Sequence, residues 1–111
     1  MPVASSRIFR IDKFAVPVEA RDAFLAKVKA AHVLLDSAEG CLQNHVLEQV
    51  SGSGSFNIVT LVEWRDQAAY DQARAAAQAR HQVEGFDRQA MFETMGINPD
   101  LANYAIVPHA Q

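Results

Sequence analysis

Hydrophobic and polar positions follow a period of two in some parts of the chain and a helical period in others. Ile8 to Val16 is rich in β-branched and aromatic residues, which predicts a strand that ends at Val16-Pro17. From Ala20 the apolar positions recur at helical spacing. They are Ala20, Phe24, Val28, Ala31 and Leu35. Gly40 is well placed to stop this first helix.

A hairpin and a second helix are predicted next. The strands are Leu42 to Val50 and Phe56 to Trp64, joined by a turn of Gly and Ser at 51–55. Asp66 is a good N-cap for the following helix. The inward face of that helix should carry Tyr70, Ala73, Ala77 and His81, with Arg74 on the same side.

The C-terminal third predicts two short elements. Gly85 interrupts the second helix, and a short helix from Asp87 to Met95 ends at Gly96. Asn98-Pro99-Asp100 predicts a turn before a last strand, Ala102 to Val107. The order β-α-β-β-α-β predicts an α+β, ferredoxin-like fold with a four-stranded antiparallel sheet. At 111 residues we expect one domain over 1–111, with a structured core from about 8 to 107.

Two main helices can cover only one face of such a sheet. Pairing the hairpin about Ser53 gives the helix-facing side of these strands both apolar and polar members. They are Leu42, Val46, Val50, Phe56, Ile58, Val62 and Trp64, with Asn44, Glu48 and Thr60 as the polar ones. The other face should carry Cys41, Gln43, His45, Leu47, Val59, Leu61 and Glu63. That face is too apolar for water and too polar for a monomer core, so we predict a homodimer in which it meets a partner sheet.

Composition removes several classes of function. Half the residues are hydrophobic, 21% are charged and the net charge is −3, so there is no basic field for nucleic acid or an anionic membrane. The segment Met1–Ser6 is too short and too polar for a signal peptide. The lone Cys41 cannot form an internal disulfide. We expect a reduced, cytoplasmic protein.

Three segments in this order carry a family resemblance. They are Glu39-Gly40-Cys41-Leu42, Leu61-Val62-Glu63-Trp64, and the helix from Asp66 through Tyr70 to His81 and Gly85-Phe86-Asp87. From about Ile8 to Val107 the chain resembles the antibiotic biosynthesis monooxygenase family. The resemblance implies ferredoxin-like subunits that pair into a dimeric α+β barrel. It also implies cofactor-independent oxygenation of a phenol, quinol or similar electron-rich ring.

His81 is the first candidate for the general base of that reaction. It ends the inward face of a helix whose Ala73 and Ala77 leave space, and imidazole suits acid–base work near neutral pH. The structural alternative is a helix-end histidine satisfied by a carbonyl or by Glu84. Asp12 could orient His81 or accept a hydrogen bond from a phenol, or it could pair with Arg10 on the same strand.

The predicted substrate-binding residues are Trp64, Tyr70, Arg74 and Asn44. The two aromatic rings would form apolar walls, and Arg74 or Asn44 would donate hydrogen bonds. Three of them have a structural alternative: Trp64 closes a core, Tyr70 lies at a core edge, and Asn44 bonds to backbone.

The remaining patterns predict no cofactor. His32 lies at the rim of its helix, His45 faces the dimer seam, His109 is in the tail, and no pair has metal-ligand spacing. No dinucleotide loop or nucleophile elbow is present. Haem-degrading relatives use an asparagine, a tryptophan and a histidine, whereas this chain has Asp12, Ala73 and His81 near those positions. We therefore predict no tightly bound haem, flavin or metal. A non-catalytic ligand-binding or regulatory dimer remains the alternative function.

Overall fold

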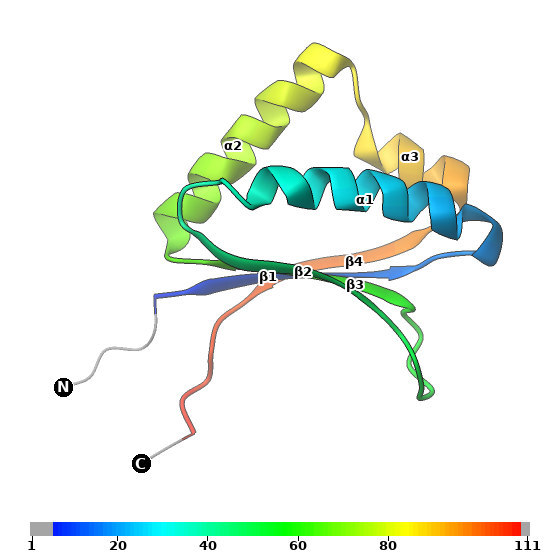
Figure 1. Ribbon diagram of the computed structural model, residues 1–111, viewed down its shortest axis with the longest axis horizontal. Helices are drawn as coiled ribbons and strands as arrows, with labels where there is room; N and C mark the ends of the chain where they lie inside the picture. Colours follow the sequence, from blue (N-terminus) through cyan, green and yellow to red (C-terminus); the bar gives the residue numbers. More distant parts are fainter. Residues whose placement is uncertain (1–5, 110–111) are drawn as a thin grey trace.

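A computed structural model describes residues 6–109, so most of the segment Met1–Ser6 lies outside the described residues. In this range four antiparallel strands form one sheet, and three α-helices lie over one of its faces (Figure 1). The strands are β1 Ile8–Ala15, β2 Cys41–Glu48, β3 Ile58–Trp64 and β4 Asn98–Tyr104, in the order β2-β3-β1-β4. The helices are α1 Arg21–Leu35, α2 Gln67–Glu84 and α3 Arg88–Met95, with a short 3-10 turn, η1 Val18–Ala20, before α1. The predicted ferredoxin-like α+β fold is confirmed.

Local signals set the ends of α2 and α3. The Asp66 side chain accepts a hydrogen bond from the Ala69 backbone N–H at 2.8 Å, and Asp87 does the same for Ala90 at 3.1 Å. Gly85 and Gly96 close the two helices in the left-handed conformation, which glycine adopts without steric cost. The predicted caps at Asp66, Gly85 and Gly96 are therefore confirmed, whereas Asp87, predicted as the first residue of its helix, is the N-cap.

Several boundaries differ from the prediction. β2 ends at Glu48 and β3 begins at Ile58, so the predicted strand ends at Val50 and Phe56 were wrong. The first helix ends at Leu35, and Gly40, with φ +83°, lies in the turn that starts β2. Asn98-Pro99-Asp100 is not a turn but the start of β4, where Pro99 lies opposite Phe14. Proline is tolerated there because β4 is an edge strand. The strand ends at Tyr104, so the prediction that it reaches Val107 was wrong.

The predicted alternation is confirmed for the middle of the hairpin but not for its ends, and Val50, expected inside, is 95% exposed. Asn44 pairs with Val62 and Val46 with Thr60, on the helix-facing side as expected. An irregularity between Cys41 and Gln43 shifts the register. Cys41 consequently pairs with Trp64 and packs against the helix-side core, not on the opposite face as predicted. Leu42, expected inside, is 46% exposed.

Apolar side chains between sheet and helices form two separate clusters. The larger cluster contains Phe14, Val16, Ala20, Phe24, Leu25, Ile58, Phe92 and Ile97 and joins the sheet to α1 and α3. The smaller cluster contains Val62, Trp64, Ala69 and Tyr70 and joins the sheet to the first turns of α2. After these turns α2 rises away from the sheet, so that its C-terminal end is the farthest part of the helix from it (Figure 1).

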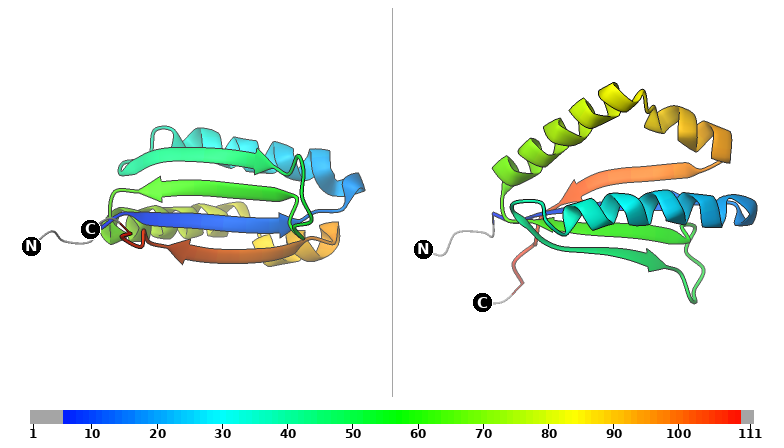
Figure 2. Two further views of the ribbon diagram at one scale, coloured as in Figure 1. Left: turned by 90° about the horizontal axis from the view of Figure 1, so that it is seen from below. Right: turned by 45° about the horizontal axis from the view of Figure 1, so that its top comes forward.

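The second face of the sheet has no helix over it (Figure 2). By strand alternation, Phe9, Ile11 and Lys13 lie on this open face, together with the predicted Leu47, Val59 and Leu61. Glu63 is buried there all the same, because its carboxylate accepts from Arg7 at 3.0 Å and from Gln43 at 2.7 Å. Within residues 6–109, no helix combines the length and hydrophobicity needed to cross a membrane.

Candidate functional site

A band of polar side chains crosses the helix-facing side of the sheet between the two apolar clusters. We call Arg10, Asp12, Asn44 and Thr60 the polar band. The strand register places Asn44, Val62, Arg10 and Asn103 in one row across the four strands. Asp12 and Thr60 pair in the neighbouring row, and both are buried. Ligand sites combine apolar walls with a few placed polar groups, and the band has both kinds of side chain.

Arg10 is the centre of the band. Its Nε donates to Oδ1 of Asp12 at 2.7 Å, and its Nη1 donates to the Tyr70 hydroxyl at 3.0 Å. A weaker contact of 3.5 Å reaches Oδ1 of Asn103. Burial raises the pKa of Asp12, although the Arg10 guanidinium beside it acts in the opposite direction. Asp12 and Arg10 thus pair with each other, the structural alternative considered from the sequence.

Trp64 and Tyr70 lie beside the Arg10 end of the band. Their rings meet edge to face with centroids 6.5 Å apart, and both side chains are buried. The Tyr70 hydroxyl accepts from Arg10, so the tyrosine joins α2 to β1. Both residues belong to the smaller apolar cluster, which is the core role weighed as their alternative. Their predicted role as substrate walls remains a prediction.

His32 stands over the other end of the band. Its Nδ1 lies 3.0 Å from Oδ1 of Asn44, and Nδ2 of Asn44 donates to Oδ1 of Asp36 at 2.9 Å. Burial lowers the pKa of His32. The helical pattern predicts this histidine at the rim of α1 and Ala31 inside, but Ala31 is exposed and His32 is half-buried. The helical spacing of Phe24, Val28 and His32 was the signal that could have found it.

His81 and Arg74 lie away from this cluster. His81 is in the last turn of α2, where its ring meets Phe86 edge on at 4.9 Å. The positions Tyr70, Ala73, Ala77 and His81 are the less exposed ones of the helix, as predicted, and Arg74 is exposed. However, only the first turns of α2 reach the sheet (Figure 1). No hydrogen bond or ring contact links His81 or Arg74 to the polar band in residues 6–109. Their functional roles remain predictions.

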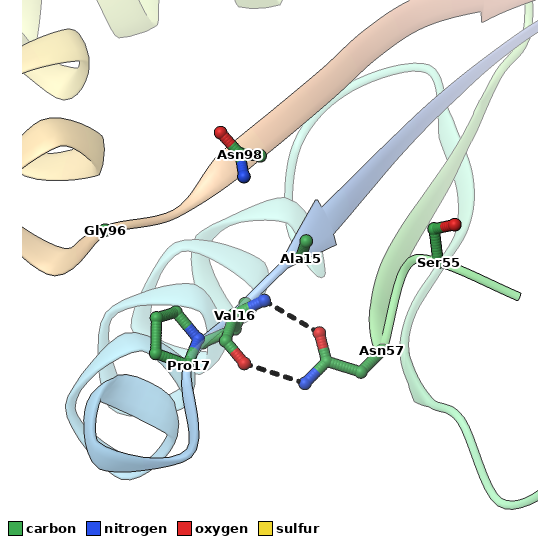
Figure 3. A pocket seen from close by; sticks show the side chains of 7 residues that line it. All are labelled: Ala15, Val16, Pro17, Ser55, Asn57, Gly96 and Asn98. Carbon is green, nitrogen blue, oxygen red and sulfur yellow. Dashed lines mark hydrogen bonds between the residues drawn. The ribbon is translucent and has the colours of Figure 1, made fainter.

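A shallow, open depression of about 320 Å³ lies elsewhere, between the end of β1 and the start of β4. Figure 3 shows that Asn57 points to the Val16 backbone, where its amide forms two hydrogen bonds of 2.8 and 3.0 Å. Its other lining residues include Ala15, Pro17 and Ser55. With its main amide engaged and no acid or base in its wall, this depression offers less chemistry than the polar band. None of the described residues form a group of three His, Cys, Asp or Glu that could hold a metal ion.

Comparison with known families identifies the class of the protein. The model described as "Antibiotic biosynthesis monooxygenase" matches residues 7–85, and the chain belongs to this family. The match covers the polar-band residues, Trp64, Tyr70 and both α1 and α2. A comparison with curated proteins found no match.

Several solved structures share the fold at low sequence identity. A protein of Shewanella loihica PV-4 is 18% identical, with a TM-score of 0.69 over 97% of this chain and 100% of that one. SnoaB, a cofactor-independent oxygenase from Streptomyces nogalater, is 13% identical, with a TM-score of 0.66 over 94% and 96%. The heme-degrader MhuD of Mycobacterium tuberculosis is 16% identical, with a TM-score of 0.64 over 94% and 99%. At these identities the likeness concerns the fold alone.

Proposed function

We propose that the protein is a cofactor-independent monooxygenase for an electron-rich phenol or quinol, and that the substrate binds at the polar band. The observation that carries this proposal is the Arg10–Asp12–Tyr70 cluster between two apolar clusters. A flat aromatic ring needs hydrocarbon on its faces, and its phenolic oxygen needs polar partners. Family membership and the fold shared with SnoaB support the same class of reaction.

The chemistry requires little from the protein. An aromatic phenol whose keto form carries a CH2 group can supply all four electrons that oxygen takes up. The carbon loses two hydrogens, gains one oxygen atom and becomes a carbonyl, and the second oxygen atom leaves as water. The protein must remove the first proton, stabilise the anion and exclude water. Arg10 and the Tyr70 hydroxyl would stabilise the anion, and Trp64 would cover the ring.

We propose further roles for the other candidate residues of the site. Asp12 would hold Arg10 in place and could accept a phenolic hydrogen bond. Asn44 is engaged by Asp36 and His32, so its role would be to position and not to donate to the substrate. The sequence favours His81 as the base, whereas His32 is the histidine that contacts a residue of the band, Asn44.

We also propose that the protein is a homodimer formed through the open face, working in the reducing cytoplasm. The apolar members of that face include Phe9, Ile11, Val59 and Leu61, and Leu47 is 49% exposed. A stable interface of this class buries on the order of 2,000 Å² in total. The mixture of Leu with Lys13 and His45 suits a second, self-complementary copy better than water.

Oxygen uptake is the direct test. The protein would be mixed with 1,8-dihydroxyanthrone and with a panel of hydroquinones, and the rate compared with autoxidation without protein. We expect faster uptake, one oxygen atom from ¹⁸O2 in the product, and a large loss in Arg10→Gln. Arg21→Gln is the matched control, because Arg21 pairs with Glu48 at the surface. Phenol binding with no uptake above background would instead favour the non-catalytic ligand-binding dimer.

A further inference from the structure

We propose that His32 is the residue that accepts the phenolic proton, and that Asn44 is the positioning residue that fixes its tautomer. This inference rests on the proposed function and names a residue of the same site. It differs from the assignment of His81 that the sequence favours. The hydrogen-bond chain Asp36–Asn44–His32 is the observation that carries it.

The direction of each hydrogen bond follows from Asp36. An ionised carboxylate can only accept, so the Asn44 group 2.9 Å from Asp36 must be its NH2. The Asn44 oxygen then faces Nδ1 of His32 at 3.0 Å. An amide oxygen can only accept, so Nδ1 must carry the hydrogen. In the neutral imidazole the lone pair is therefore on Nε2.

Nε2 of His32 is the ring nitrogen available to accept a proton from a ligand. The described residues provide it with no hydrogen-bond partner. Asn44, beneath the ring, shares its row with Val62 and Arg10, so His32 stands across Val62 from the Arg10 cluster. Val62 is itself buried in the smaller apolar cluster, so a ligand ring would lie between α1 and α2, with Arg10 and Tyr70 on one side and His32 on the other.

The surroundings keep this imidazole neutral. Burial lowers the pKa of His32 more than its partners raise it. The charged and titratable groups that act on it are Asp36 after α1, Asp12 on β1 and His45 on β2. Asp36 and Asp12 both favour the charged imidazolium that forms when His32 takes the proton of a phenol. A base that is unprotonated at neutral pH and stabilised after the transfer suits the reaction.

His81 lacks these features. Its ring contacts Phe86, its backbone carbonyl accepts from the Phe86 N–H, and it lies in the last turn of a helix that rises away from the sheet. No side chain of the described residues forms a hydrogen bond that would fix its tautomer. It is thus a natural internal control.

The test uses 1,2-dihydroxyanthraquinone, a planar phenol that is already at the quinone level and whose anion absorbs at longer wavelength than its neutral form. Quenching of Trp64, the single tryptophan, reports binding. At a pH where the free dye is neutral, we expect wild type and His81→Gln to bind it as the anion. His32→Gln should bind the neutral dye. Turnover of 1,8-dihydroxyanthrone should fall by roughly 10²–10⁴-fold in His32→Gln. Asn44→Ala should lower kcat with little change in KM.

Nitrogen NMR of the imidazoles gives a reading that needs no substrate. We expect His32 as the Nδ1–H tautomer in wild type and as a tautomer mixture in Asn44→Ala. An Nε2–H tautomer in wild type, anion formation that persists in His32→Gln, or its loss in His81→Gln overturns the inference. If the wild-type protein neither binds the dye nor oxygenates the anthrone, the proposed function fails. The NMR result still decides which ring nitrogen of His32 is unprotonated.

Discussion

Arg10 on β1 donates a hydrogen bond to the hydroxyl of Tyr70 on α2, sixty residues later in the chain, at 3.0 Å. The bond is one of few ties between this helix and the sheet, because the buried residues of α2 are Ala69 and Tyr70. It also holds the guanidinium that carries the proposed anion site. The same contact therefore bears on stability and on the proposed function, and the two can be measured separately.

Tyr70→Phe should lower the free energy of unfolding by about 1 kcal/mol, because one partly buried hydrogen bond is lost while the ring contact with Trp64 remains. Chemical denaturation at fixed protein concentration measures the change. Tyr104→Phe is the matched control, since Tyr104 is 41% exposed and its ring, not its hydroxyl, faces Lys13. Equal effects in the two variants would contradict a specific role for the Arg10–Tyr70 bond.

Gly40→Ala should be strongly destabilising, by about 3 kcal/mol. Gly40 has φ +83°, and an added Cβ would lie 2.5 Å from the Cβ of Ala69, so left-handed strain adds to overpacking. Thermal or denaturant unfolding measures the loss. Gly85→Ala separates the two causes, because Gly85 has φ +68° and open space around it, and should lose only about 1 kcal/mol. A Gly40 variant as stable as the Gly85 variant would show that α2 can yield at Ala69.

Stability should fall as the pH drops below the ordinary histidine pKa of 6.5, and His32 should cause part of this fall. Burial lowers the pKa of His32 in the folded protein, so between the two values the unfolded chain binds more protons than the folded one. The free energy of unfolding therefore decreases with falling pH until native His32 is protonated too.

Denaturation curves between about pH 5 and pH 8 test this, with His32→Gln as the variant. The variant should show a shallower decrease below pH 6.5 and the same pH dependence as wild type above pH 7.5, where both states are neutral at this position. Parallel curves over the whole range would mean that His32 titrates alike in the folded and unfolded chains.

Leu47→Lys should dissociate the proposed homodimer without unfolding the subunit. Leu47 is 49% exposed on the open face, where a charge would lie inside the interface but in water in the monomer. Light scattering at micromolar concentration should give the monomer mass, with an unchanged far-ultraviolet CD spectrum. Val33→Lys, at a 66% exposed position on α1, should remain dimeric. A wild-type protein that is already monomeric would reject the assembly.

The order of elements and the helix caps could be predicted because their signals are local. Asp66, Gly85, Asp87 and Gly96 each act within one turn of their own position. The alternation of β1 was equally plain, because Arg10 and Asp12 are two residues apart and therefore share one face of the strand.

The features that could not be predicted from the sequence depend on contacts between elements that are distant in the chain. The register shift at Cys41 arises from the pairing of this residue with Trp64 on the neighbouring strand, and no local sequence pattern predicts it. His32 and Ala31 both fit a helical stripe, and hydrophobicity alone favours the alanine, whereas the structure turns the histidine toward Asn44. The rise of α2 away from the sheet separates His81 from the band, and helix periodicity carries no information on that angle.

The division of the interior into two apolar clusters has a thermodynamic consequence. The two clusters are separate, and the buried residues that attach α2 to the sheet, Ala69 and Tyr70, lie near the N-terminus of the helix. An aromatic ligand bound at the band would add apolar contacts between the two clusters and the first turns of α2. Its binding energy then becomes folding energy, about 2.7 kcal/mol when the free ligand is present at 100 times its Kd. Slower amide exchange in α2 and a higher Tm would accompany occupancy, so a thermal-shift screen of phenols is also a search for the substrate.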